Sequence, residues 1–256
     1  MKLNRWNYYI DLITVLTQKE IKIRYKNSIL GYLWSILNPL AMALIFFFAF
    51  KKVLKVQIED YTYFLICGLF PWQWFINSVS LSTNALIGNS TLIKKVNFPR
   101  QFIPLAVVLN DAVHFILSLP VVIFFGFYYK IYPNLSWIYG VPLLFFSQFI
   151  LIFGLSLFVS ALNLFFRDLE RIVNIGIMLL FYATPIFYTM KFVPEKYKKI
   201  LLFNPLVFLI ENWRNVLMRG YLDFYKYGIN LVYNLLLFLI CFYIFKKLSH
   251  KFAEVL

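Results

Sequence analysis

The stretch NSILGYLWSILNPLAMALIFFFAF, residues 27–50, carries no charge, and the basic segment KEIKIRYK, residues 19–26, leads directly into it. A helix crosses the hydrocarbon core of a bilayer with about 20 apolar residues, so this stretch is long enough to span a membrane. Further uncharged runs follow along the chain, at residues 61–93, 131–166, 172–190 and 227–245, and at 101–129 with only Asp111 and His114 interrupting. The repeated pattern predicts a helical membrane protein that crosses the bilayer several times.

Apolar residues make up 62% of the 256 residues, well above the roughly 45–50% of soluble domains. A soluble bundle buries one or two such runs but not six, and a β-barrel needs short strands with alternating polar and apolar residues. We predict an all-α membrane protein that forms a single transmembrane domain over residues 1–256. Its six predicted transmembrane helices cover residues 33–53, 61–82, 103–129, 137–165, 171–190 and 229–246.

The formal net charge of +14 does not indicate a nucleic-acid partner, because the basic residues lie at the predicted membrane edges and meet lipid headgroups there. With both termini cytoplasmic, that side carries 14 Lys and Arg residues against 11 on the other side, or against 4 without the long segment 191–228. The count favours cytoplasmic termini. Cys67 and Cys241 are interpreted as small buried hydrophobes, and no cleavable signal peptide is expected.

The first 32 residues have a mixed character. Apolar residues recur there at roughly helical spacing, at Trp6, Tyr9, Ile10, Ile13 and Leu16. This pattern predicts an amphipathic helix that lies in the membrane interface and turns into the first span near Gly31, with a solvated leader as the alternative.

Three polar residues, Asn110, Asp111 and His114, lie inside the third predicted span. Ionisable groups at membrane depth indicate a functional site or a water-filled path, but an Asp–His pair that fixes helix packing is the interpretation we favour. The chain shows no second acidic cluster, so we predict neither a catalytic nor a metal site.

The connection between spans two and three has the pattern of a short helix, capped by Asn89-Ser90-Thr91 and ended by Pro99. Its apolar side chains beside lysines are suited to docking against a partner protein, although an ordinary interfacial helix has the same composition. The segment consists of Leu92, Ile93, Lys94, Lys95, Val96, Asn97 and Phe98.

The connection between spans five and six is long, with a break at Thr184-Pro185, a turn at Asn204-Pro205 and an amphipathic stretch at 206–219. A pair of short re-entrant helices that form an outer gate fits this pattern, and a surface cap is the alternative. Glu211 and Arg214 stand three residues apart, so an internal pair on one helix face is the alternative to a gating role for them. The predicted gate residues are Phe187, Tyr188, Phe203, Leu206, Phe208, Leu209, Glu211 and Arg214.

Several of these segments resemble one family. YKNSILGYLWSILNP at 25–39 is similar to the start of span one in ABC exporter permeases of the second type, and most similar to the polysaccharide branch. LIKKVNFPR at 92–100 resembles the cytoplasmic coupling segment of that branch. The same order continues with NLFFRD at 163–168, TPIFY at 184–188, NPL at 204–206 and ENWR at 211–214.

The resemblance implies a half-transporter in the bacterial cytoplasmic membrane. Two copies would form the channel for a lipid-linked polysaccharide of the O-antigen, capsule or teichoic-acid type, and two ATPase subunits would supply ATP and Mg²⁺. The chain itself has no Gly-x-x-x-x-Gly-Lys motif. The implied organisation is a cytoplasmic interfacial helix (1–32), spans one to five (33–190), an outer gate segment (191–228), and span six with a cytoplasmic tail (229–256).

The implied substrate would arrive at the cytoplasmic face beside the basic residues Lys19, Lys22, Arg24 and Lys26, which we predict to form the substrate entrance. Orientation of the helix and contact with anionic lipid are the other interpretation of these charges. Three alternatives to polysaccharide export remain: a permease for a drug or simple lipid, a membrane-embedded glycosyl or acyl transferase, and a channel acting alone.

Overall fold

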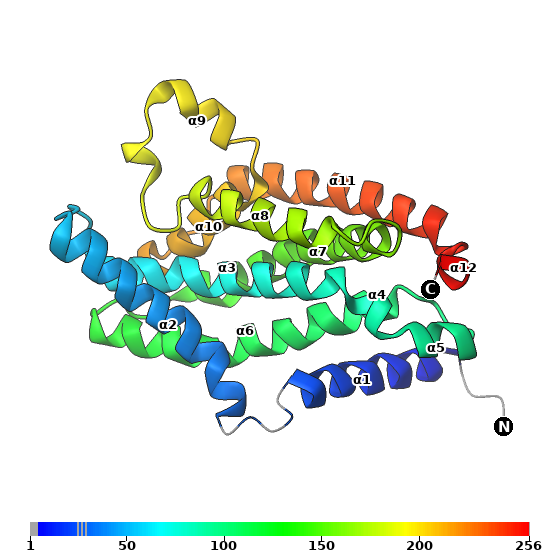
Figure 1. The fold of residues 1–256 in the computed structure, drawn as a ribbon. Helices are drawn as coiled ribbons and strands as arrows, with labels where there is room; N and C mark the ends of the chain where they lie inside the picture. The colour runs from blue at the N-terminus through cyan, green and yellow to red at the C-terminus, as the bar shows by residue number, and fades with distance from the viewer. Residues whose placement is uncertain (1–4, 25, 27, 29, 256) are drawn as a thin grey trace.

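The computed structural model describes residues 5–24, 26, 28 and 30–255, and within these residues it contains helices and no strands. Long helices run alongside one another and form the body of the molecule (Figure 1). They are α3 (Tyr61–Thr83), α6 (Phe102–Tyr128), α7 (Leu135–Phe165) and α11 (Phe224–Ser249). The predicted all-α fold class is confirmed.

Five helices are long and apolar enough to cross a membrane: α3, α6, α7, α11 and the stretch Trp34–Val53. That stretch begins as α2 (Trp34–Phe46), after the short η1 (Gly31–Leu33), and continues as the π-helical η2 (Phe47–Val53). Charged residues are absent from the interiors of these helices except at Asp111, because an unpaired charge in hydrocarbon is costly.

The predicted fifth span at 171–190 is shorter than expected, because its helix α8 (Leu169–Tyr182) has only 14 residues. The chain turns directly afterwards. Pro185 has no backbone N–H to continue the helix, and Thr184 Oγ1 donates to the Leu180 carbonyl oxygen at 2.6 Å. The helix therefore ends eight residues before residue 190, where we predicted the span to end.

The core lies around α3, which packs against α2, α6, α7 and α8 and has most of its residues buried. Polar bonds join the helices inside this core. Gln148 Nε2 of α7 donates to the Pro71 carbonyl oxygen at 2.8 Å, and Gln148 Oε1 accepts from Trp213 Nε1 at 2.7 Å. These bonds satisfy polar groups that water cannot reach, so α3, α7 and the segment carrying Trp213 are fixed relative to one another.

One end of the bundle gathers the chain ends and the short helices. The start of α1 (Arg5–Arg24) and α12 (Phe252–Val255) lie there together with α4 (Ala85–Gly88) and α5 (Ser90–Lys95) (Figure 1). A second apolar cluster holds this end, and its buried members include Leu16, Ile93, Phe98, Ala161, Phe245 and Phe252. Because α1 packs against α6, the amino-terminal helix is part of the folded body.

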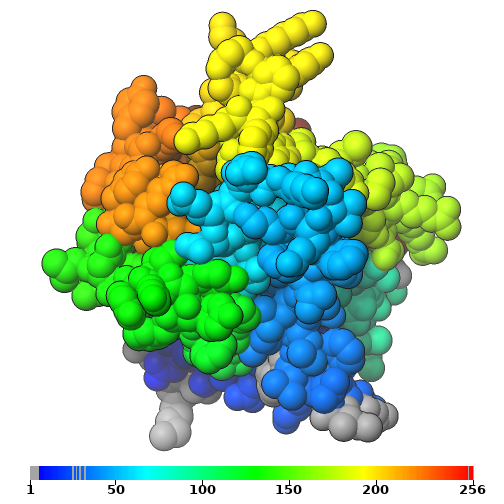
Figure 2. Space-filling model, turned by 90° about the vertical axis from the view of Figure 1, so that its left-hand side faces the viewer, coloured from blue at the N-terminus to red at the C-terminus, as the bar shows by residue number. Residues whose placement is uncertain are grey.

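The other end carries the long connection, with η3 (Met190–Phe192), α9 (Glu195–Leu201), α10 (Pro205–Arg214) and η4 (Asn215–Arg219). Helix α9 projects from the body, as the yellow segment in Figure 2 shows. Helix α10 instead packs against α3, α7 and α11, and Asn204 caps it by accepting from Leu206 N at 3.0 Å. The connection thus consists of one projecting helix and one buried helix.

Candidate functional site

Of the four predicted substrate-entrance residues, two bond to other helices and two lie on the surface. Lys19 Nζ donates to Asn89 Oδ1 in the α4–α5 turn, and Arg24 Nη1 donates to Asp111 Oδ1 in α6. Both cations line a hollow of about 340 Å³ between α1, α4 and α6. Lys22 and Lys26 are exposed. The four residues therefore do not form a single cluster of solvated cations: Lys19 and Arg24 hold α1 against the bundle, and the other two lie on the surface.

Asp111 is 1% exposed and pairs with Arg24, a partner that the sequence did not indicate, while its predicted packing pair with His114 stays a prediction. Ser78 Oγ of α3 donates to Asp111 Oδ2 at 3.0 Å, so this carboxylate joins α1, α3 and α6. His114 lies one turn away and lines a small hollow of about 20 Å³ with Asp111. Among the side chains that the structure describes, Asn110 Oδ1 is buried without a hydrogen-bond partner.

The predicted coupling segment forms the short helix α5 and the extended residues after it. Ile93 and Phe98 are buried against the second apolar cluster, and Leu92 is half-buried beside it. Lys94, Lys95, Val96 and Asn97 are exposed. This corrects the expectation that the larger apolar side chains are the docking surface: two of them hold the segment to its own chain, and the exposed face is basic and polar.

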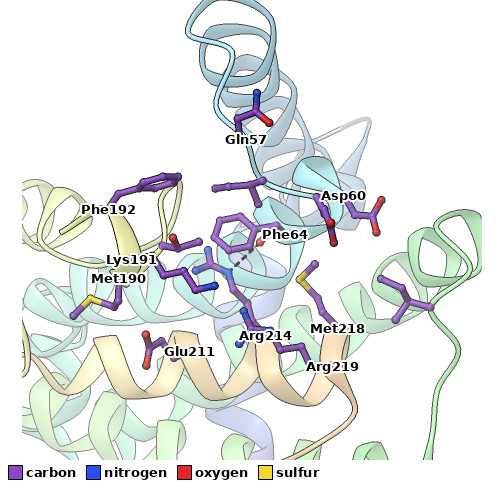
Figure 3. Close-up of a pocket in the computed structure, with 14 residues that line it drawn as sticks. Gln57, Asp60, Phe64, Met190, Lys191, Phe192, Glu211, Arg214, Met218 and Arg219 are labelled. Carbon is purple, nitrogen blue, oxygen red and sulfur yellow. Dashed lines mark hydrogen bonds between the residues drawn. The ribbon is translucent and has the colours of Figure 1, made fainter.

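A pocket of about 650 Å³ opens at the opposite end, between the α2–α3 connection, the turn after α8, and α10 with η4 (Figure 3). Its charged lining residues are Glu59, Asp60, Lys191, Glu211, Arg214 and Arg219. Glu211 and Arg214 project from one helix, but Glu211 Oε2 lies 3.3 Å from Lys226 Nζ of α11. The structure therefore pairs Glu211 with Lys226 and not with Arg214, which contradicts the alternative of an ion pair within the helix.

Arg214 is 6% exposed and bonds to backbone carbonyls. Its Nε donates to the Phe64 carbonyl oxygen at 3.2 Å, and its two Nη atoms donate to the carbonyl oxygens of Pro185 and Ile186. The guanidinium carbon stands 3.5 Å from the centroid of the Phe64 ring, a cation–π contact. Burial lowers the pKa of Arg214 to about 9, so the guanidinium remains charged at neutral pH.

The other predicted gate residues lie in different surroundings. Leu206 and Leu209 are buried and Phe208 is half-buried, whereas Phe203 is 77% exposed before α10 and does not share their packing. Phe187 stacks on Phe46 of α2, with ring centroids 5.5 Å apart. Tyr188 donates from its hydroxyl to the Tyr182 carbonyl oxygen at 3.0 Å. Phe203 thus does not belong with the buried group, while the gating role of the remaining residues stays a prediction.

Sequence reasoning missed two residues that build this end. Gly68 of α3 gives room for Arg214, because a Cβ at Gly68 would lie 2.7 Å from Arg214 Nη2. Tyr61 donates from its hydroxyl to the Phe187 carbonyl oxygen at 2.8 Å and so holds the turn after α8. A glycine in the middle of an apolar run is the only sequence signal for the first, and the second has none. Within the described parts of the chain, no three His, Cys, Asp or Glu side chains gather at a metal-binding distance.

The chain is similar to known proteins over most of its length. The model of the family "ABC-2 type transporter" matches residues 11–218. An O-antigen export system permease protein RfbA of Klebsiella pneumoniae is 48% identical over 249 residues, which cover 97% of this chain and 96% of the relative. The RfbA protein of Myxococcus xanthus is 33% identical over 81% of this chain and 80% of its own length.

A more distant relative is the polysialic acid transport protein KpsM of Escherichia coli, which is 28% identical over 86% of both chains. The matched residues run from α1 through η4, so they include the buried Asp111, the α5 segment and the pocket around Arg214. Both the family match and the identities extend over most of the chain. The chain belongs to the ABC-2 type transporter family, as a membrane subunit and not an enzyme.

Proposed function

We propose that this chain is the channel-forming subunit of an ATP-driven exporter that moves lipid-linked polysaccharide across the bacterial inner membrane. The observation that carries the proposal is its 48% identity, over nearly the full length of both chains, to a permease named for O-antigen export. An O-antigen is the first choice, and capsule or teichoic-acid chains are the wider class. ATP and Mg²⁺ would be bound by a separate ATPase subunit.

The topology that we propose has six crossings and cytoplasmic termini. Helix α8 would extend about 21 Å at 1.5 Å per residue, less than the roughly 30 Å of hydrocarbon, so the turn after it would complete the fifth crossing. Helix α10 would then return into the outer leaflet as a re-entrant helix, and α11 would cross last. The exposed apolar side chains of α1, among them Trp6, Ile10 and Val15, support a position of α1 in the membrane interface.

Two copies of the chain would form the channel. Helix α8 has no buried residue, and α2 exposes a row of large apolar side chains, at Leu37, Met42, Leu44 and Ile45. These surfaces support pairing of two subunits around a path between them. Cysteine cross-linking in membranes that yields only monomers during active export would rule the pairing out.

The function is tested in a strain that lacks its own O-antigen permease but makes the polymer. Supplying this chain with its ATPase should restore polymer on the cell surface, and an ATPase unable to hydrolyse ATP should abolish that restoration. A drug or simple-lipid permease would lower accumulation of such a compound without delivering polymer. Efflux of such a compound without polymer on the cell surface would refute the proposal and favour that alternative.

The ATPase is expected to dock on the exposed part of the α5 segment. Reversing Lys94 and Lys95 to Glu and changing Val96 to Asp should lower recovery of the ATPase with the permease at least about tenfold, since each change opposes a favourable contact. The fold should survive, because all three side chains are exposed. Co-purification from membranes measures the result.

The matched control reverses Lys246 and Lys247, two exposed lysines at the end of α11 near the same end of the bundle. A single Ile93→Asp change is a poor test because it buries a charge in the second apolar cluster and damages the fold itself. Full recovery of the ATPase with the triple variant would remove the coupling role from α5.

A further inference from the structure

A groove of about 370 Å³ between α2 and α3 is lined mostly by uncharged polar side chains. Helix α2 contributes Ser35 and Asn38, and α3 contributes Gln73, Asn77 and Ser80. All five lie within the two candidate spans Trp34–Val53 and Tyr61–Thr83. Neither the family match nor the named relatives assign any role to these residues.

Amide and hydroxyl side chains are costly in contact with hydrocarbon, so their presence inside a span indicates a hydrated path or polar partners. Gln73, Asn77 and Ser80 are spaced four and three residues apart and therefore share one face of α3. Each of the three is only half-buried, whereas their neighbours Trp74, Phe75 and Val79 face the core. The polar face of α3 is thus turned toward the groove.

Bonds within the chain use only part of the hydrogen-bonding capacity of this face. Gln73 Nε2 donates to Asn77 Oδ1 at 2.8 Å, and Ser80 Oγ donates to Asn174 Oδ1 of α8 at 2.9 Å. A side-chain amide has two N–H donors and an oxygen with two lone pairs. Donors on Asn77 and acceptors on Gln73 therefore remain for a ligand, next to the exposed indole ring of Trp34 on the α2 side.

The groove has almost no net charge to offer a ligand. Among the described residues that line it, Arg24 is the one with a charge, and Arg24 is paired with Asp111. Side-chain amides, hydroxyls and an aromatic face together match the hydroxyl groups and the apolar ring face of a sugar. A phosphate or a carboxylate would find no unpaired cation among the lining residues.

We propose that the α2–α3 groove binds uncharged, hydroxyl-rich sugar residues of the exported chain, an inference that rests on the proposed function of polysaccharide export. Neutral amides exchange hydrogen bonds between one hydroxyl and the next without holding any of them strongly. A transport path requires this balance, because a site must be favourable enough to enter and weak enough to leave. The groove also shares Arg24 and Leu81 with the hollow beside α1 and α4, which joins it to the predicted entrance.

The double variant Gln73→Leu/Asn77→Leu tests the groove in cells that carry the full exporter and make a neutral polysaccharide. The rate at which polymer reaches the surface, per copy of the permease in the membrane, should fall about tenfold or more, as expected from the loss of two or more hydrogen bonds. The variant Gln73→Asn/Asn77→Gln keeps both amides and should restore at least part of the rate. Gln18→Leu, which removes an exposed amide from α1, should leave the rate unchanged.

Subunit cross-linking and ATPase recovery are measured on the same membranes. An unchanged export rate in the Leu double variant overturns the groove inference, and so does a loss of rate that follows loss of cross-linked dimer, since the amides would then serve subunit contact. If the unmodified chain delivers no polysaccharide at all, the proposed function fails instead. The groove inference alone is therefore refuted when the unmodified exporter is active and the Leu double variant is equally active.

Discussion

Replacing Arg24 with Met is expected to destabilise the folded chain by about 3 kcal/mol or more. The change removes the cation that pairs with Asp111, a carboxylate that is 1% exposed. Ser78 Oγ remains as a donor, but one hydroxyl does not compensate a buried charge. At about 2–4 °C per kcal/mol for a chain of this size, thermal unfolding in detergent should begin at least roughly 6 °C lower.

The double variant Arg24→Met/Asp111→Leu separates a lost ion pair from a lost anchor. Removing both charges leaves no carboxylate in the core, so the double variant should recover most of the stability that Arg24→Met loses. Lys22→Met is the matched control, because Lys22 is exposed on the same helix. Protease sensitivity of α1 should increase in Arg24→Met and not in the control. Equal unfolding temperatures for Arg24→Met and Lys22→Met would show that the pair contributes little.

Long apolar runs determined most of what could be predicted about the fold. Five of the predicted spans agree within a few residues with the helical stretch Trp34–Val53 and with α3, α6, α7 and α11, because a run without charge has only the helix to satisfy its backbone in lipid. In the fifth run, 172–190, the helix ends before the predicted end of the span. Hydropathy continues through Pro185 to Met190, but a missing N–H ends the helix whatever the hydropathy of the following side chains.

Apolar runs and helical spacing do not predict contacts between residues that lie far apart in the sequence. Asp111 pairs with Arg24, which lies 87 positions earlier in the chain, and spacing within the third predicted span gave no sign of this contact. Arg214 bonds to carbonyl oxygens 28 and 29 residues earlier and to that of Phe64, none of which its spacing from Glu211 indicated. Helical spacing predicts which residues share a face and says nothing of the helix that this face meets.

Burial divides the coupling segment in a way that composition could not show. The pattern LIKKVNF contains four apolar residues that look equivalent in sequence. The fold buries Ile93 and Phe98 against α12 and its neighbours and leaves Val96 exposed. The short helix was therefore predictable from the sequence, while the division into buried and exposed side chains depended on the packing of an element near the other end of the chain. Its docking role stays a prediction.

At the end of the bundle that carries α9 and α10, replacing Arg214 with Met is expected to loosen the connection between α10 and the turn after α8. The change removes charge-assisted bonds to three carbonyl groups, each worth about 1.5–3 kcal/mol in comparable cases, so several kcal/mol of local stability are lost. The buried face of α10 should then open toward water. A cysteine at Leu209, which is 1% exposed, should be shielded from a membrane-impermeant thiol reagent in the idle parent protein and become reactive in the Arg214→Met variant.

The labelling is done after both native cysteines, which are buried, have been replaced by Ala. A cysteine at Phe203 is the matched control: this side chain is 77% exposed, so it should react in the parent and in the variant alike. Gly68→Ala provides an independent test, because its added Cβ would lie 2.7 Å from Arg214 Nη2 and displace a guanidinium that three carbonyls hold in place. It should expose Leu209→Cys as Arg214→Met does, but to a smaller degree. Shielding of Leu209→Cys in both variants would mean that apolar packing alone keeps α10 in place, and that the bonds of Arg214 do not.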